Sequence, residues 1–144
     1  MVIGFTCSCF DLFHPGHLFM LEEAKTKCDK LWVGLQVDPS RDRPEKNKPV
    51  QSFFERWIQV QANKNVDRII PYETEADLIN ILLSFDIDIR IIGDEYKDKN
   101  FTGKTECEEK GIEIYYNKRF HSYSSTELRG RLSRTKCEKE TTIE

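Results

Sequence analysis

Short apolar runs alternate with amphipathic segments along most of this chain. The apolar runs are rich in Ile, Val and Leu, which is typical of buried strands. The segments between them carry apolar residues at helical spacing. We therefore predict strands at residues 2–6, 31–37, 68–71, 87–93 and 112–116, and helices at residues 17–27, 52–63, 75–85, 104–110 and 124–132.

This alternation favours right-handed β-α-β units and an α/β fold, namely a Rossmann-like, doubly wound, five-stranded parallel sheet with helices on both faces. The length of 144 residues suits a single domain. We assign residues 1–134 to that domain and residues 135–144 to a polar C-terminal tail. Ligands of such sheets bind beyond the carboxyl ends of the strands, so the loops that follow the strands are expected to form the site.

Local signals mark several helix ends. Ser52 with Glu55, and Thr74 with Asp77, have the spacing of capping boxes, and Gly111 ends the short helix before the last strand. The segment 38–51 contains three prolines and no apolar period, and is therefore expected to be a loop.

Composition narrows the classes of function. Hydrophobic residues make up 38% of the chain and charged residues 33%, and no apolar run is long enough to span a membrane. The net charge of −3 argues against a general nucleic-acid binder. Five cysteines without a disulfide-framework spacing favour free thiols in a reducing compartment, so we expect a cytoplasmic protein.

The first candidate motif, His14-Pro15-Gly16-His17, follows the first strand at a predicted helix start. Free backbone N–H groups and the helix dipole favour an anion there, and Gly16 lets a ligand approach the backbone. Two imidazoles beside such a start suggest phosphate chemistry. Two alternatives remain open: a pair of surface histidines, and a zinc site with Cys7 and Cys9, whose spacing is poor. We assign no metal ligands.

Two further segments could supply phosphate contacts. Lys46 and Lys48 lie in the proline-rich loop, and Arg56 lies on the helix after it; a solvated loop is the alternative reading. Arg119 precedes a row of hydroxyls at another helix start, where capping alone explains one hydroxyl but not three. The hydroxyl residues are Ser124, Ser125 and Thr126.

In this order, these motifs resemble the small cytidylyltransferases of the HxGH nucleotidyltransferase superfamily, in particular the glycerol-3-phosphate cytidylyltransferases. The resemblance runs from residue 3 to about residue 132. The family begins T-[Y/F]-G-T-F-D-L-x-H-x-G-H, where this chain has residues 6–17, and ends R-T-E-G-I-S-T-T, where it has residues 119–126. Lys48, Arg56 and the pair Gly93-Asp94 match features between these motifs.

The resemblance implies a nucleotidyltransferase domain that transfers CMP from CTP to a small phosphomonoester, with glycerol 3-phosphate as the leading acceptor, and releases pyrophosphate. It implies Mg²⁺ bound with the triphosphate, a homodimer, and no nucleic-acid or membrane partner. The catalytic residues would be His14, His17, Lys48 and Arg119. Arg56 and Lys46 would bind the acceptor. The nucleotide-binding residues would be Thr6, Cys7, Ser8, Cys9, Phe10, Asp11, Gly16, Asp94, Ser124, Ser125 and Thr126.

The chain also departs from the family pattern. Ser8 and Cys9 replace a Gly and a Thr in the first motif, and residues 120–122 replace Thr-Glu-Gly in the last. Two other functions therefore remain open: an adenylyltransferase that uses ATP with a sugar phosphate or cofactor precursor, and a nucleotide-binding module without catalysis. Asp11 is equally suited to capping its loop and to contacting a ligand.

Overall fold

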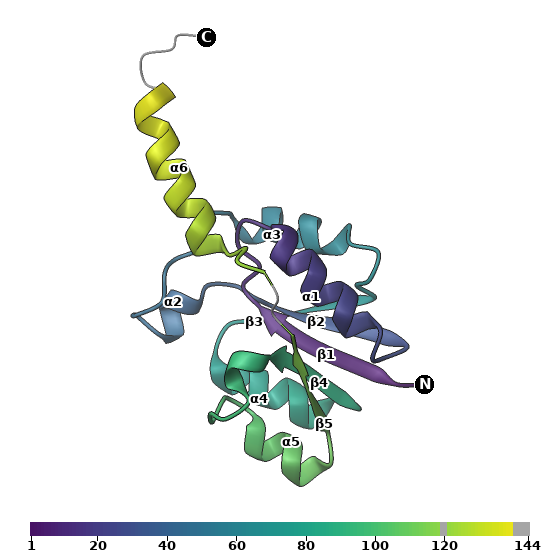
Figure 1. The fold of residues 1–144 in the computed structure, drawn as a ribbon. Coiled ribbons are helices and arrows are strands. Elements are labelled where there is room, and N and C mark those ends of the chain that lie inside the picture. The colour runs from purple at the N-terminus through teal and green to yellow at the C-terminus, as the bar shows by residue number, and fades with distance from the viewer. Residues whose placement is uncertain (119–120, 140–144) are drawn as a thin grey trace.

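A five-stranded, fully parallel sheet forms the centre of the molecule (Figure 1). The computed structural model describes residues 1–118 and 121–139, the last five of these by their backbone alone. The strand order is β3-β2-β1-β4-β5, so the chain winds outward from β1 in one direction and then crosses back to β4. The strands are β1 (Ile3–Ser8), β2 (Lys30–Gln36), β3 (Arg68–Tyr72), β4 (Ile89–Gly93) and β5 (Glu113–Asn117).

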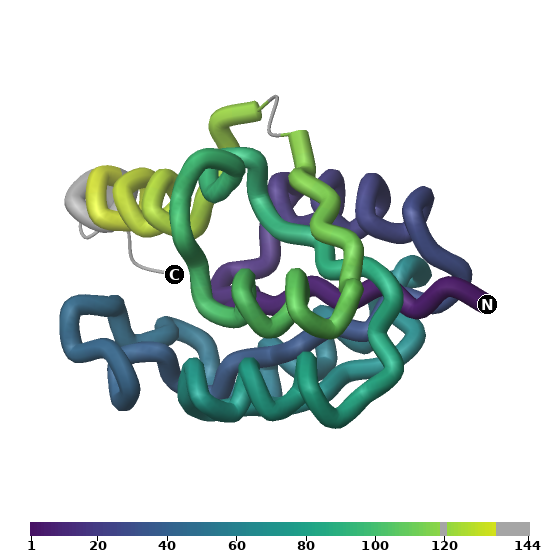
Figure 2. The backbone as a smooth tube through the Cα atoms, turned by 90° about the horizontal axis from the view of Figure 1, so that it is seen from below, coloured from purple at the N-terminus to yellow at the C-terminus, as the bar shows by residue number. Residues whose placement is uncertain are grey.

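Helices cover both faces of this sheet, which confirms the doubly wound α/β fold. In Figure 1, α1 (Pro15–Lys25) and α3 (Phe53–Gln61) lie on one face, and α4 (Glu75–Ser84) and α5 (Lys104–Lys110) on the other. Figure 2 views the second face, with α4 and α5 in front of the strands. Leu31, Val33 and Leu35 alternate along β2 toward the first face, while Phe5 of β1 is buried beneath the second.

The predicted capping signals are confirmed. Ser52 and Glu55 form a capping box at the start of α3, and Thr74 and Asp77 form one at the start of α4. Gly111 closes α5 in the left-handed conformation with φ 79°, a backbone geometry that disfavours residues with a side chain.

Several element boundaries differ from the sequence prediction. β1 continues to Ser8, and α1 begins at Pro15, because proline suits the first turn of a helix, where no N–H is needed. The expected loop 38–51 contains the short helix α2 (Pro39–Asp42), which Asp38 caps through the Ser40 N–H. A 3₁₀ turn, η1 (Asp94–Tyr96), follows β4.

Helix α6 (Ser125–Lys139) runs past residue 132 into the segment expected to be a tail. Figures 1 and 2 show it projecting from the body of the molecule. The domain boundary at residue 134 stays a prediction, since this helix crosses it. Within the described residues, no helix has the length and apolar character needed to cross a bilayer.

Arg56 of α3 ties together three segments below the carboxyl edge of the sheet. Its side chain is buried, with 2% of the residue exposed. The guanidinium donates to the carbonyl oxygens of Cys9 at 3.0 Å, Gln36 at 2.6 Å and Gln51 at 3.3 Å, and also to that of Val37. Arg56 therefore fixes the end of β2, the loop after β1 and the start of α3.

We expect Arg56→Met to lower the free energy of unfolding by about 3 kcal/mol, because several buried carbonyl oxygens lose their donor. Urea denaturation measures the change. Arg41→Met is the matched control: its side chain is 66% exposed and pairs with Glu73 at the surface, so the loss should stay below about 1 kcal/mol. Equal, small losses in both variants would contradict the structural role of Arg56.

Candidate active site

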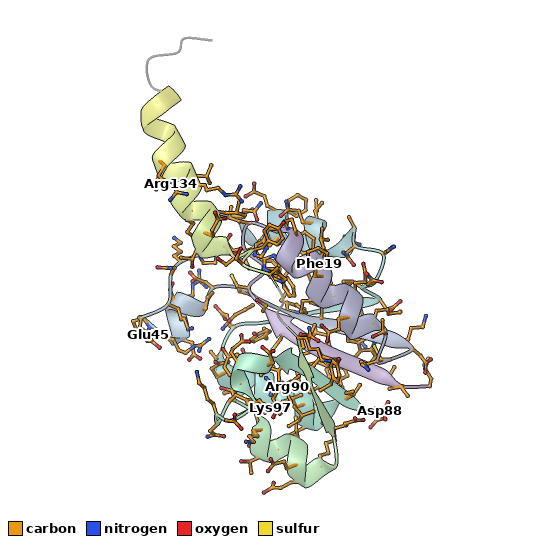
Figure 3. All side chains as sticks on the ribbon, viewed as in Figure 1. Phe19, Glu45, Asp88, Arg90, Lys97 and Arg134 are labelled. Atoms are coloured by element: carbon orange, nitrogen blue, oxygen red, sulfur yellow. The ribbon has the colours of Figure 1, made fainter. Side chains whose placement is uncertain are left out.

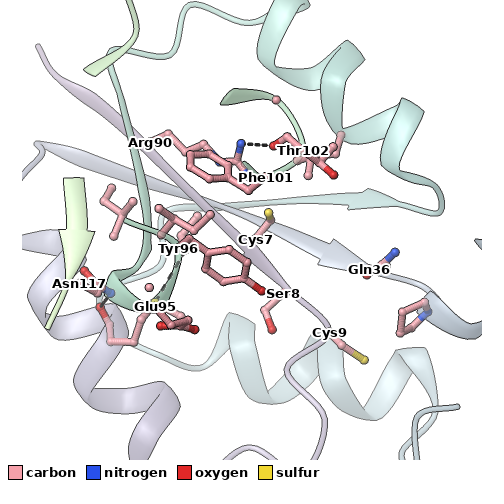
Figure 4. Close-up of a pocket in the computed structure, with 18 of the residues that line it drawn as sticks. Cys7, Ser8, Cys9, Gln36, Arg90, Glu95, Tyr96, Phe101, Thr102 and Asn117 are labelled. Atoms are coloured by element: carbon pink, nitrogen blue, oxygen red, sulfur yellow. Dashed lines mark hydrogen bonds between the residues drawn. The ribbon is translucent and has the colours of Figure 1, made fainter. Parts of the chain in front are cut away.

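A cavity of about 1130 Å³ opens at the carboxyl ends of the strands. Residues from the loop after β1, from the segments after β4 and β5, and from the start of α6 line it together. Figure 4 shows Cys7, Ser8 and Cys9 passing along the cavity, with Glu95 and Asn117 on one side. The polar segments that the sequence analysis expected to meet therefore do meet in one cavity.

His14 and His17 stand side by side at the start of α1, with ring centroids 3.9 Å apart. Nδ1 of His14 accepts from the Gly16 N–H at 3.0 Å, and Nδ1 of His17 accepts from the His14 N–H at 3.2 Å. A neutral imidazole that accepts through Nδ1 carries its proton on Nε2. The pair is thus held in the tautomer that donates from Nε2.

His17 is a neutral group in this site. Burial lowers its pKa to about 3, and the neighbouring His14 acts in the same direction. The His17 ring stacks on Phe13 at a centroid distance of 5.4 Å and lies 5.2 Å from Phe10. His17 can therefore donate a hydrogen bond at neutral pH, but it does not supply a positive charge there.

Gly16 lies between imidazoles. A Cβ at this position would lie 2.7 Å from Cε1 of His14 and 2.8 Å from Cε1 of His121. Such distances are too short for a real carbon contact, so a larger residue would push at least one ring aside. The absence of a side chain at Gly16 thus keeps the backbone of the first helical turn close to the cavity.

Asp11 organises the loop that precedes the histidines. Its carboxylate accepts from the Val50 N–H at 2.9 Å and the Gln51 N–H at 3.0 Å, and pairs with Arg129 of α6 at 2.7 Å. The Asp11 carbonyl accepts from the Ser125 hydroxyl at 2.6 Å. One buried residue therefore joins the first loop, the segment before α3, and α6, so capping is its observed role.

The residues on either side of Asp11 are strained. Phe10 has φ 50° and Leu12 has φ 51°, in the left-handed region that residues with side chains rarely adopt. The Leu12 N–H donates to Oε1 of Gln51 at 2.8 Å, and the Phe10 side chain is buried in the core. The hydrogen bonds to Asp11 and Gln51 hold the loop in this conformation.

The start of α6 contributes hydroxyls to the same cavity. Ser124 and Ser125 line it, and Oγ of Ser124 accepts from the Glu127 N–H at 3.0 Å. Thr126 is exposed and lies outside the cavity lining. Arg119, expected to hold the triphosphate, lies outside the residues that the structure describes.

The other expected site residues divide into two groups. Lys46 lines the cavity, as do residues 6–9, and burial raises the pKa of the Cys7 and Cys9 thiols, so both remain neutral. Six expected residues do not line it: Phe10, Asp11, Lys48, Arg56, Asp94 and Thr126. Phe10 belongs to the core, the guanidinium of Arg56 is taken up by carbonyl oxygens, and Lys48 and Asp94 are exposed.

Sequence reasoning missed Arg90, a buried cation that lines the cavity on the α4/α5 face (Figures 3 and 4). Its guanidinium donates to the carbonyl of Thr102 and lies 5.0 Å from the centroid of the Phe101 ring. It thereby holds the segment after η1 against the cavity. The available signal was one arginine inside the apolar run that forms β4.

Metal-binding groups do not gather in the described part of the chain: no three His, Cys, Asp or Glu residues there are arranged to hold an ion. Glu95 brings a carboxylate to the cavity lining, and its oxygens fold back against Gly93. Glu75 and Glu106 also line the cavity, so the carboxylate oxygens that Mg²⁺ prefers are present there without being clustered.

The fold and this site define a nucleotidyltransferase-type α/β protein. The chain belongs to the cytidylyltransferase-like family, whose family model matches residues 5–131. Among curated relatives, the bifunctional protein HldE of Acidiphilium cryptum (strain JF-5) is 34% identical over 125 residues, which are 86% of this chain and 26% of that protein. HldE of Caulobacter sp. (strain K31) is 32% identical over 91% of this chain and 27% of its own length. The chain thus spans about a quarter of the length of these relatives.

Solved structures share the fold. A lipopolysaccharide core biosynthesis protein from Thermoplasma volcanium GSS1 matches with a TM-score of 0.68 and 24% identity, over 84% of this chain and 99% of that one. A pantothenate synthetase from Thermus thermophilus matches with a TM-score of 0.61 and 13% identity, over 91% of this chain and 64% of that one.

The Asp11 contacts predict a pH-dependent contribution to stability. Burial raises the pKa of Asp11, but the hydrogen bonds from Gln51, Val50 and Arg129 outweigh it, so the pKa lies below its ordinary value of 3.8. We expect Asp11→Asn to cost about 2 kcal/mol of unfolding free energy near pH 7, where the carboxylate is charged. The difference from wild type should narrow below pH 3.8, as the wild-type carboxylate becomes protonated. Urea denaturation of both proteins at a series of pH values measures this difference in unfolding free energy. A difference that widens in acid would contradict the lowered pKa of Asp11.

The environment of His17 predicts that its ring stays neutral well below the ordinary pKa of 6.5. NMR of the Cε1–H signals, assigned with a His17→Gln variant, should show no titration of His17 between pH 5 and 8. Because the unfolded chain binds this proton more readily, His17 should lower stability as the pH falls from 6.5 toward 3. A midpoint near 6.5 would refute the buried, neutral imidazole.

Proposed function

We propose that this chain transfers a nucleoside monophosphate from a nucleoside triphosphate to a small phosphomonoester and releases pyrophosphate. The observation that carries the proposal is the meeting of the paired imidazoles at the start of α1 with the hydroxyls at the start of α6, in one cavity. At the start of α1 the backbone N–H groups of Gly16 and His17 donate to His14, so the donors available there are the imidazole Nε2–H groups. Together with the Ser124 hydroxyl and the positive ends of two helix dipoles, they suit a site for several phosphate groups. CTP is the donor that the family membership supports.

The proposed step is a displacement at the α-phosphorus. An oxygen of the acceptor phosphate forms the new P–O bond, and the bond to the bridging oxygen between α- and β-phosphates breaks, with its electron pair leaving on pyrophosphate. A phosphomonoester has a second pKa of about 6 and is mostly dianionic near pH 7, so it attacks without a general base. This chemistry suits His17, which acts as a neutral donor rather than as a base.

The residues then stabilise charge and orient the reacting groups. His14 and His17 donate to phosphate oxygens whose charge grows in the transition state, and the Ser124 hydroxyl donates to an oxygen at the second helix start. The Ser125 hydroxyl already donates to the Asp11 carbonyl, so Ser125 would contact phosphate through its backbone N–H. Lys46 lines the cavity and would bind the triphosphate. Lys48 and Arg119 are proposed to bind the triphosphate on the strength of the family motif. Mg²⁺ would be held mainly by the triphosphate oxygens, where it neutralises charge.

The acceptor is proposed to be a phosphorylated polyol or sugar. Glycerol 3-phosphate follows from the motif resemblance. A sugar phosphate with ATP as donor is the alternative to test, because Ser8, Cys9 and residues 120–122 depart from the family pattern. The family resemblance also implies a homodimer, which light scattering of the purified chain tests directly.

A pyrophosphate-release assay tests the reaction. Purified chain with Mg²⁺ is incubated with CTP or ATP and each of glycerol 3-phosphate, hexose and heptose phosphates, phosphocholine and phosphoethanolamine. We expect release with at least one pair, and a loss of at least about 100-fold in turnover for His17→Ala, because one transition-state donor is removed.

Glu108→Gln, an exposed change on α5 outside the cavity, serves as the control and should keep full turnover. Urea denaturation of both variants shows that they are folded. Nucleotide binding without release of pyrophosphate from any pair would instead support a non-catalytic binding module, and near-normal turnover of His17→Ala would remove this imidazole from the mechanism.

A further inference from the structure

We propose that three aromatic side chains, Phe19, His121 and Tyr123, form a wall on which the nucleobase of the bound nucleotide stacks. The inference rests on the proposed function in one respect: it takes the phosphates of a nucleoside triphosphate to lie at the paired imidazoles. It assigns the base to Phe19, which lies outside the family motifs, and to His121 and Tyr123, two positions of the last motif at which this chain differs from the family.

The wall is assembled from two separate segments. Phe19 belongs to α1 (Figure 3), whereas His121 and Tyr123 precede α6. The ring centroids of Phe19 and His121 are 5.7 Å apart, those of His121 and Tyr123 are 5.5 Å apart, and those of Phe19 and Tyr123 are 6.3 Å apart. The interplanar angles lie between 31° and 38°, so the three rings present roughly similar orientations.

These rings are not part of the hydrophobic core. Phe19 is 39% exposed and Tyr123 is 43% exposed, whereas Phe5 and Phe10 are buried. All three wall residues line the cavity. Apolar ring surface left in water has an unfavourable free energy, and at a ligand cavity it marks a surface that a ligand can cover.

The wall adjoins both phosphate-binding helix starts. The His121 ring lies against Gly16, where a Cβ would come within 2.8 Å of its Cε1 atom, and Gly16 is in the first turn of α1. Tyr123 directly precedes Ser124, and its backbone N–H donates to Nδ1 of His121 at 3.2 Å, which orients the His121 ring against the segment that leads into α6. A nucleotide held by its phosphates between α1 and α6 has its base within reach of these rings.

The chemistry of the wall suits a nucleobase rather than the acceptor. Every base has a flat π face, and stacking on aromatic side chains stabilises binding without requiring a particular sequence of donors and acceptors. A polyol or sugar phosphate has no such face. His121 and Tyr123 stand where the family motif has Glu and Ile. Two of the three wall residues are therefore at positions where this chain differs from the family.

The test compares probes with and without a base. We measure equilibrium dissociation constants of CTP, ATP and inorganic tripolyphosphate for wild type, Phe19→Leu and Tyr123→Leu by calorimetry, in Mg²⁺ buffer. Each leucine variant keeps an apolar side chain and loses a ring, so both nucleotides should bind about ten-fold more weakly. Tripolyphosphate binding should change less than about two-fold, because its contacts are with the helix starts.

Two further variants control the comparison. Phe54→Leu makes the same substitution at a ring that is 70% exposed on α3 and outside the cavity, and should leave all three constants unchanged. Tyr123→Phe returns a ring to the wall and should recover the nucleotide affinity lost in Tyr123→Leu. Thermal unfolding of each variant shows that the fold is retained.

Different results separate this inference from the proposed function. Unchanged nucleotide affinity in both leucine variants, or equal weakening of nucleotides and tripolyphosphate, would overturn the stacking wall even if the wild type turns over. Ring-dependent nucleotide binding without release of pyrophosphate would leave the wall standing and overturn nucleotidyl transfer.

Discussion

The carboxylate of Asp11 is the interaction on which the arrangement of the site depends. The segment before α3 and helix α6, far apart in the sequence, both donate to it, and α6 also supplies residues that line the cavity. The neighbouring positions have left-handed backbone conformations that the chain would not adopt unaided. Arg56 has the complementary role. Its buried guanidinium donates to carbonyl oxygens at the end of β2 and in the loop that contains Asp11. One anion and one cation thus hold the irregular backbone between the strands and the first helix.

Much of the fold followed from local sequence signals. Apolar runs located all five strands, and the pairs Ser52–Glu55 and Thr74–Asp77 located two helix starts, because these signals depend on neighbouring residues alone. The short α2 and the full length of α6 were missed. A helix of four residues has no apolar period to detect, and α6 is polar over much of its length.

The sequence predicted which edge of the sheet carries the cavity better than it predicted which residues line the cavity. The carboxyl ends of parallel strands must lie along one edge, which is why the His motif and the Ser124–Ser125 pair were expected together. The roles of single cations were not accessible in this way, since Arg56 and Lys48 look equivalent in a sequence and differ only in burial. Arg90 and the aromatic wall depend on long-range packing, because their neighbours come from separate elements.

The tautomers of the paired imidazoles also bear on which ions this site attracts. Both Nδ1 lone pairs are engaged by backbone N–H groups, and both Nε2 atoms therefore carry hydrogen rather than a lone pair. A transition metal binds imidazole through a nitrogen lone pair, so copper or zinc would have to displace a capping hydrogen bond at the start of α1 to gain a ligand here. The backbone geometry that readies these rings for phosphate oxygens makes them poor ligands for such cations, although their residue types suggest the opposite.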